Sequence, residues 1–251
     1  MNDRVAIVTG ASRASGIGAA IARELAVAGW NLLLTGWASY DVEQGLATVG
    51  SSHLADPAMM EELRGLGVAA DVLECDLADP QSPDRVLEAA ERLGPVTGLV
   101  NNATHSERTA LDQLDAETLD RHYAINLRAP ALLSRSFANR LHGGSGRIVN
   151  LTSGQGLTPM PGELAYAATK GGLEAFTSSL AAALAPRGIT VNAIDPGATD
   201  TGWMSDEQRR MLAAPMGRLG EPRDAARLVR FLMSPEAGWI TGQVIRSRGG
   251  L

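Results

Sequence analysis

Two side chains that could move a proton stand four positions apart, at Tyr166 and Lys170. On a helix, residues at this spacing share a face, so the phenol and the ammonium would lie close together. A tyrosine normally titrates near pH 10, too high for acid–base work at neutral pH. At about 4 Å and an effective dielectric near 20, an ammonium attracts a phenolate by roughly 4 kcal/mol before desolvation. One pKa unit takes only about 1.4 kcal/mol, so the pair predicts a lowered Tyr166 pKa and a proton donor for a developing alkoxide.

Two further polar residues suit the same chemistry. The hydroxyl of Ser153 could donate to a substrate oxygen on which charge builds, although a plain turn residue beside Gly154 is the alternative. Asn126 falls inside a predicted helix, where asparagine is unfavourable. Pro130 lacks the N–H that would bond the Asn126 carbonyl, which could then hold a water in a proton relay toward Lys170. A helix kink with no chemical role is the alternative.

A glycine-rich turn follows the first apolar run of the chain. It reads Thr-Gly-Ala-Ser-Arg-Ala-Ser-Gly-Ile-Gly from position 9 to 18 and leads into a helix-forming stretch. Glycine lets the backbone turn sharply and approach a ligand closely. The helix that follows offers free N–H groups and the positive end of its dipole to a pyrophosphate. Its place between a strand and a helix favours nucleotide binding over a turn that serves packing alone.

Strand and helix patterns alternate along the whole chain. The predicted strands are Val5–Val8, Asn31–Thr35, Val68–Cys75, Gly98–Asn101, Arg147–Leu151, Ile189–Ile194 and Gln243–Ile245. The predicted helices are Gly18–Ala28, Pro57–Leu66, Ser82–Leu93, Glu117–Leu141 with an interruption at Pro130, Gly162–Ala185 and Glu221–Met233. This alternation predicts one Rossmann-type α/β domain over residues 1–251, with a doubly wound, mostly parallel seven-stranded sheet and helices on both faces. Residues 36–56 form an unusually long connection, and the sequence leaves open whether it is an ordered excursion near a cofactor or a mobile insertion.

Composition excludes several classes of protein. With 45% hydrophobic residues and a net charge of −6, the chain is an ordinary globular sequence with no basic surface for nucleic acid. It has no uncharged apolar run long enough to span a membrane, and its start is unlike a signal peptide. Cys75 is alone, so no internal disulfide forms, and we expect a buried strand residue in a cytoplasmic protein. The four histidines, at positions 53, 105, 122 and 142, show no metal-binding spacing, so no metal is expected.

Three more segments complete a recognisable pattern. Asn101-Asn102-Ala103 follows the fourth predicted strand, Asp195-Pro196-Gly197 follows the sixth, and the chain closes with Trp-Ile-Thr-Gly-Gln-Val at 239–244. With the glycine turn, Ser153 and the Tyr166/Lys170 pair, the sequence from Val5 to Gly250 resembles a short-chain dehydrogenase/reductase, and is most similar to the 3-oxoacyl-acyl-carrier-protein-reductase-like members.

The resemblance implies a role for each matching residue. The catalytic set would be Asn126, Ser153, Tyr166 and Lys170, with Lys170 also donating to ribose hydroxyls. The cofactor would be held by Gly10, Ser12, Arg13, Gly16, Ile17, Gly18, Asp76, Leu77, Asn102, Ala103, Tyr166, Lys170, Pro196, Gly197, Thr199 and Thr201. Asp76 would contact adenine, or else only cap the end of its strand. Relatives are usually homotetramers, so a homotetramer is expected.

The sequence departs from the family in two places. Ala14-Ser15 is a two-residue insertion in the glycine turn, which should leave pyrophosphate binding intact but makes the direction of Arg13 uncertain. Thr104 replaces the glycine that commonly follows Asn-Asn-Ala, and its side chain narrows the site or displaces the loop.

Cofactor choice depends on the end of the second strand. NAD enzymes usually place an acid there for the ribose 2′-hydroxyl, but none occurs here before Asp41. Arg13 could pair with a 2′-phosphate, so NADP is favoured over NAD. Trp37 could pack within the long connection or stack on adenine.

The expected activity is NADP(H)-dependent reduction of a carbonyl, of ketone or 3-oxoacyl type, by hydride transfer with Tyr166 as general acid. The alternatives are an NAD-dependent alcohol dehydrogenase on the same site and a noncatalytic nucleotide-sensing protein. The substrate is a small molecule that the sequence does not specify. Residues near the expected substrate site are Trp203, Met204, Met211 and Met216, which suggest an apolar pocket or a helix core. His105 could also face substrate.

Overall fold

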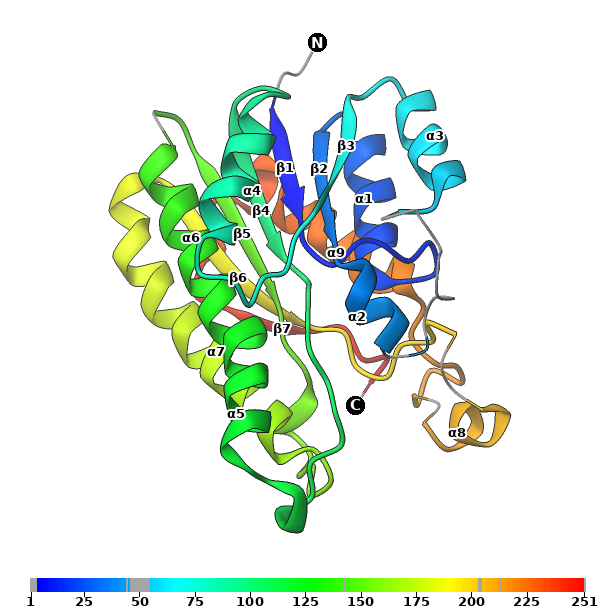
Figure 1. Cartoon of the computed structure of the whole chain (residues 1–251). Helices are drawn as coiled ribbons and strands as arrows, with labels where there is room; N and C mark the ends of the chain where they lie inside the picture. Colours follow the sequence, from blue (N-terminus) through cyan, green and yellow to red (C-terminus); the bar gives the residue numbers. More distant parts are fainter. Residues whose placement is uncertain are drawn as a thin grey trace.

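The structure is a computed structural model that describes residues 4–43, 45, 55–141, 143–202, 205–212 and 214–250, with only the backbone at positions 206 and 208. Within these residues the strands form one parallel sheet of seven, in the order β3-β2-β1-β4-β5-β6-β7 (Figure 1). The strands are β1 (Val5–Val8), β2 (Asn31–Gly36), β3 (Ala70–Glu74), β4 (Val96–Asn101), β5 (Gly146–Leu151), β6 (Ile189–Asp195) and β7 (Val244–Arg246). The predicted doubly wound sheet is therefore confirmed.

Helices cover both faces of this sheet. They are α1 (Ile17–Val27), α2 (Ala38–Glu43), α3 (Pro57–Gly65), α4 (Ser82–Glu91), α5 (Ala116–Tyr123), α6 (Ala129–Arg140), α7 (Leu164–Leu184), α8 (Asp206–Met211) and α9 (Pro222–Leu232). Short turns of helix are η1 (Leu111–Gln113), η2 (Ala124–Arg128), η3 (Gly154–Gly156), η4 (Ala185–Arg187) and η5 (Pro235–Ala237).

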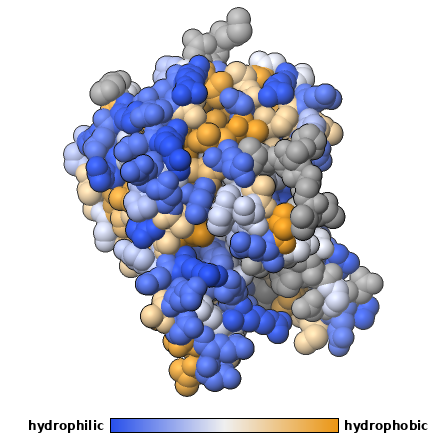
Figure 2. All heavy atoms as spheres, in the orientation of Figure 1, coloured by the Kyte–Doolittle hydropathy of each residue, from blue (hydrophilic) through white to orange (hydrophobic). Residues whose placement is uncertain are grey.

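The core lies in two layers because successive residues of a strand point to opposite faces. In β1, Ala6 and Val8 pack in the cluster with α1, α3 and α9. Val5 and Ile7 pack in the other cluster, with α4, α6 and α7. Strands buried on both sides read as continuous apolar runs, which is the pattern that identified them in the sequence. The outer face in Figure 2 is largely hydrophilic.

The long predicted helix from Glu117 to Leu141 is divided. α5 ends at Tyr123, η2 forms one π-helical turn, and α6 begins at Ala129. Pro130 has no N–H to continue the α-helical pattern, and the Ala129 N–H instead reaches back five residues to the Ala124 carbonyl. The interruption expected at Pro130 thus appears as a π-turn that contains Asn126.

Smaller differences occur at the ends of β2 and β3. α2 follows β2 directly, so the first part of the long connection is an ordered helix, whereas positions 44 and 46–54 lie outside the described residues. β3 ends at Glu74, so Cys75 is buried as expected but lies just after the strand. Among the described helices, none is long and apolar enough to cross a membrane.

Candidate active site

The glycine turn after β1 is packed so closely that side chains would not fit. Gly10 has φ +66°, and a Cβ there would lie 2.7 Å from the Ala103 Cα. A Cβ on Gly18 would lie 2.6 Å from the Gly10 carbonyl oxygen. α1 begins after Gly16 with no side-chain cap and no acid in its first turn, so its first N–H groups are open to an anion. This arrangement fits a pyrophosphate.

Asn102 joins the glycine turn to the loop after β4. Its side-chain amide donates to the carbonyls of Thr9 and Gly10, both at 2.9 Å. The backbone N–H groups of Asn102 and Ala103 donate in turn to the Thr9 hydroxyl, both at 3.0 Å. These four bonds fix the loop that leads into Thr104.

The inserted residues Ala14 and Ser15 are tied down at both ends. Arg23 of α1 donates to the Ala14 carbonyl at 2.9 Å. Ser15 donates to the Thr201 carbonyl at 3.4 Å, so the insertion bridges the turn to the segment after β6. The turn can therefore accommodate two extra residues without opening.

α2 lies against the same turn, which the sequence did not predict. The Ser12 hydroxyl donates to the Asp41 carboxylate at 2.7 Å. The rings of Trp37 and Tyr40 stack with centroids 6.5 Å apart, so Trp37 packs within the connection, as one alternative held. Arg13 lies near enough to Tyr40 to affect its pKa, although burial, the larger effect, raises it.

The other cofactor-binding candidates lie in the neighbouring loops. The Asp76 carboxylate accepts from the Ala78 N–H at 2.8 Å and so caps the turn after β3, while Leu77 is buried in a core cluster. After β6, Gly197 has φ +65° and donates its N–H to Asp195 at 2.9 Å. Thr199 donates to the Gly197 carbonyl at 3.2 Å, which closes this loop.

Three elements bring the catalytic candidates together. Ser153 lies two residues after the end of β5, Tyr166 and Lys170 lie on α7, and Asn126 lies in the π-turn η2. The Lys170 ammonium is buried, donates to the Leu151 carbonyl at 2.8 Å, and stands 5.6 Å from the centre of the Tyr166 ring. Of its three N–H donors, one is bonded to Leu151 within the described part of the chain.

The predicted lowering of the Tyr166 pKa is wrong in this structure. Burial raises the pKa of Tyr166 to about 12, and hydrogen bonding by Ser153 and Thr104 only partly opposes that rise. Burial also lowers the pKa of Lys170 to about 8. The prediction from spacing assumed a pair near 4 Å in a polar medium, whereas the ammonium stands over the ring, 5.6 Å from its centre, and donates to Leu151. Desolvation by burial is therefore the largest influence on both pKa values.

Asn126 is fully buried and its side chain is held on both sides. It accepts from the His105 N–H at 2.7 Å and donates to the His105 carbonyl at 2.9 Å, which fixes the orientation of its amide. The amide also donates to Thr169 on α7 at 3.2 Å, and its oxygen accepts from the Thr104 hydroxyl at 3.1 Å. That the Asn126 carbonyl holds a relay water stays a prediction.

Comparison with known proteins places this arrangement in a family. Residues 10–251 match the family described as "Enoyl-(Acyl carrier protein) reductase". The chain is 46% identical to the "Uncharacterized oxidoreductase YjdA" of Bacillus subtilis (strain 168), covering 99% of this chain and 96% of the relative. It is 37% identical to the 3-oxoacyl-[acyl-carrier-protein] reductase FabG of Vibrio cholerae, covering 100% and 98%.

The chain belongs to the short-chain dehydrogenase/reductase family. It is an oxidoreductase. Solved structures agree: a blue fluorescent protein from a metagenomic library, in complex with NADPH, superposes with a TM-score of 0.85 at 34% identity, over 98% of this chain and 97% of that one. A 3-oxoacyl-[acyl-carrier protein] reductase from Brucella melitensis superposes with a TM-score of 0.85 at 30% identity, over 100% and 98%.

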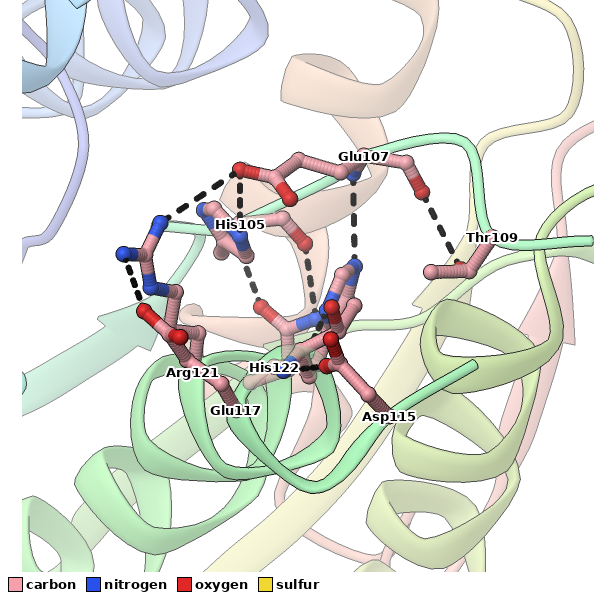
Figure 3. A network of polar contacts seen from close by, with 9 residues as sticks. His105, Glu107, Thr109, Asp115, Glu117, Arg121 and His122 are labelled. Carbon is pink, nitrogen blue, oxygen red and sulfur yellow. Dashed lines mark hydrogen bonds and ion pairs between the residues drawn. The ribbon is translucent and has the colours of Figure 1, made fainter. Parts of the chain in front are cut away.

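In this short-chain dehydrogenase/reductase, the His105 ring does not face the open site. It is buried between Tyr40 and His122, with ring centroids 5.7 Å and 4.6 Å away. Burial lowers the pKa of His105, His122 adds to that effect, and Glu107, 3.4 Å from its Nε2, opposes it. Figure 3 shows His105 beside Glu107 and His122. Through its contact with Tyr40, His105 joins α2 to the backbone that holds Asn126.

A buried ion pair that the sequence did not reveal lies next to Gly154, the residue after the candidate Ser153. Arg248, after β7, donates to Asp195 at 3.2 Å, and the two side chains are 14% and 2% exposed. A Cβ on Gly154 would lie 2.1 Å from the Arg248 guanidinium, and one on Gly197 would lie 2.9 Å from its Cγ. Arg248 therefore packs against the residue after Ser153 and against the loop after β6. Asp195 could be noticed in the sequence because it begins the Asp-Pro-Gly segment at 195–197, whereas no motif marked Arg248.

The substrate side is only partly described. Met211 and Met216 are 77% and 78% exposed, so the helix-core interpretation is wrong for both. Met216 lines a cavity of about 230 Å³ with Pro196, Arg218 and Arg248. Trp203, Met204, His53 and His142 lie outside the described residues. Among the described residues, no three His, Cys, Asp or Glu side chains are grouped so that they could hold a metal ion.

Proposed function

We propose that this protein is an NADP(H)-dependent carbonyl reductase that converts a ketone or 3-oxoacyl compound to an alcohol. The observation that carries the proposal is the arrangement of Ser153, Tyr166 and Lys170 beside a glycine turn shaped for a pyrophosphate. The similarity to 3-oxoacyl reductases from two organisms supports the substrate class.

The chain's own residues divide the work of the reaction. A bound nicotinamide would supply the hydride to the carbonyl carbon. Ser153 donates a hydrogen bond to the carbonyl oxygen and stabilises the charge that develops there. Tyr166 gives its proton to that oxygen, which becomes the alcohol hydroxyl. With a pKa raised to about 12, Tyr166 is protonated at neutral pH, which is the form that a proton donor needs.

Lys170 has two tasks in this proposal. Its Leu151 bond holds the ammonium in place, and the ammonium would donate to the ribose hydroxyls of a bound cofactor. Its positive charge also stabilises the phenolate left on Tyr166 after proton transfer. Asn126, held by the His105 backbone, supports α7 through Thr169 and would place its carbonyl for the water that returns a proton.

The first experiment replaces Tyr166 with Phe, which removes the proton donor and keeps the ring. Reduction of ethyl acetoacetate with NADPH should fall at least a hundredfold, because general acid catalysis contributes about 10²–10⁴. NADPH binding, followed by fluorescence, should persist. Tyr123 on α5 is an exposed matched control, so Tyr123→Phe should leave the rate unchanged. A Tyr166→Phe protein as active as wild type would refute the acid–base role.

A second candidate activity is NAD-dependent oxidation of alcohols on the same residues. Asp41 favours this activity. Its carboxylate accepts a hydrogen bond from Ser12 in the glycine turn, and its negative charge there would repel the 2′-phosphate of NADP. Arg13 and the NADPH in the similar metagenomic structure favour NADP instead.

Titration of NADPH and NADH into wild type, Arg13→Ala and Asp41→Asn distinguishes the NADP-dependent reductase from the NAD-dependent alcohol dehydrogenase. If NADP is the cofactor, NADPH binds at least tenfold tighter, about 1.4 kcal/mol, and Arg13→Ala removes that preference. The exposed Arg92 provides the control, since Arg92→Ala should change neither affinity. Tighter binding of NADH that is lost in Asp41→Asn would establish the second candidate.

We also propose that the enzyme works as a homotetramer in the cytoplasm, as the resemblance implies. Light scattering coupled to gel filtration measures the mass directly, against 26.3 kDa for one chain.

A further inference from the structure

Thr104 stands between two members of the proposed catalytic set. Its hydroxyl lies 3.1 Å from the Asn126 side-chain oxygen, and it is near enough to the Tyr166 phenol for its hydrogen bonding to count among the influences that lower the pKa of that phenol. The position itself is fixed, because the preceding Asn102 and Ala103 are bonded to the glycine turn. The side chain of Thr104 therefore lies among the residues of the proposed catalytic set.

The direction of each hydrogen bond follows from Asn126. Its amide is paired with the His105 backbone, so the oxygen faces the His105 N–H and Thr104. That oxygen can only accept, so Thr104 donates its single proton to it while Tyr166 is a neutral phenol. The lone pairs of the Thr104 oxygen remain available to the phenol hydroxyl.

We propose that Thr104 is a further catalytic residue, whose hydroxyl turns from Asn126 to the Tyr166 oxygen when the phenol gives up its proton. The proton of Tyr166 passes to the substrate oxygen, the phenolate gains the Thr104 proton as a hydrogen bond, and no covalent bond of Thr104 breaks. Asn126 keeps the His105 N–H throughout, so the turn leaves no buried acceptor unpaired. A bond to an anion is stronger than a bond between neutral groups, so the change favours the phenolate. The proposal rests on the acid–base role of Tyr166.

Other charges around Tyr166 stay constant when Thr104 is changed. The charged groups near Tyr166 are Glu163, just before α7, and Lys170, one helical turn after Tyr166. Asp195 at the end of β6 also contributes, and it is paired with Arg248. Thr104→Val removes only the hydroxyl and keeps the shape, whereas Thr104→Ser keeps the hydroxyl. The two variants thus separate hydrogen bonding from packing.

The test observes Tyr166 directly by NMR of protein labelled with ¹³C at tyrosine Cζ. The chain has three tyrosines, and the signal missing in Tyr166→Phe identifies the one required. With a pKa of about 12, the phenolate fraction at pH 11 is about one tenth, and the Cζ shift moves in proportion to it.

In Thr104→Val we expect the phenolate fraction at pH 11 to fall about tenfold, because a hydrogen bond to a charged group is worth about one pKa unit. Thr104→Ser should match wild type. A Val variant that titrates like wild type, or a Ser variant shifted as far as Val, would overturn the proposal. Tyr166→Phe that retains full activity would instead overturn the proposed function, whatever the NMR shows.

Discussion

Arg248 offers a substitution whose cost can be worked from its surroundings. Changing it to Met keeps most of the volume that packs against Gly154 and Gly197 but leaves Asp195 without its cation. Removing one partner of a buried ion pair typically costs 3–5 kcal/mol, because the other charge stays buried and unpaired. Asp195 keeps its bond from the Gly197 N–H, so we expect the lower end, about 3 kcal/mol.

For a chain of this length that loss lowers the melting temperature by about 6–12 °C. Urea unfolding of Arg248→Met and wild type, at one protomer concentration, measures the difference. The double variant Asp195→Asn/Arg248→Met is the decisive control, since it removes the stranded charge and should recover at least about 2 kcal/mol. If Arg248→Met loses less than about 1 kcal/mol of unfolding free energy, or if the double variant is no more stable than Arg248→Met, the pair contributes no more than a solvent-exposed salt bridge, and the reasoning is refuted.

Three further outcomes can be checked in the same way. Gly18→Ala should weaken NADPH binding at least tenfold, about 1.4 kcal/mol, because the new Cβ would collide with Asn102. The control is Gly171→Ala on α7, where a Cβ meets open space. This variant should bind NADPH normally and gain up to about 1 kcal/mol in unfolding free energy. Burial lowers the pKa of Lys170 from 10.5 to about 8, so the folded protein binds this proton less tightly than the unfolded chain. The unfolding free energy of wild type should therefore rise by about 3 kcal/mol between pH 8 and 10.5. Urea midpoints measured against pH should show this rise in wild type but not in Lys170→Met. The pKa of His105 is lowered by burial, so stability should fall as the pH drops below about 6.5, and thermal melts of His105→Phe should show a flatter dependence.

The architecture was accessible from sequence because its signals are local and repeated. Strands buried on both faces appear as apolar runs, and the glycine turn and the Tyr166/Lys170 spacing are short-range patterns. Every predicted strand occurs, with ends displaced by at most two residues. The helix α2 was missed because six residues carry too little periodicity to distinguish a helix from a loop.

The electrostatics were not accessible in the same way. Spacing on a helix predicted the proximity of Lys170 and Tyr166, but the Leu151 carbonyl that binds the ammonium comes from a strand. The same applies to Ser12 with Asp41 and to Asp195 with Arg248, which are 29 and 53 residues apart. Sequence gives the identity of such groups, but their solvation and partners depend on tertiary packing.

The contact of Tyr40 with His105 has a practical consequence for protein engineering. The segment that would be exchanged to alter nucleotide preference, around α2, touches the residue whose backbone positions Asn126. If α2 sets the nucleotide preference and Asn126 serves the reaction, as proposed above, we expect changes in α2 to alter turnover as well as cofactor preference. A graft of this segment from a relative should be carried out together with the loop at 104–107, and libraries that vary α2 alone should be screened for rate as well as for preference.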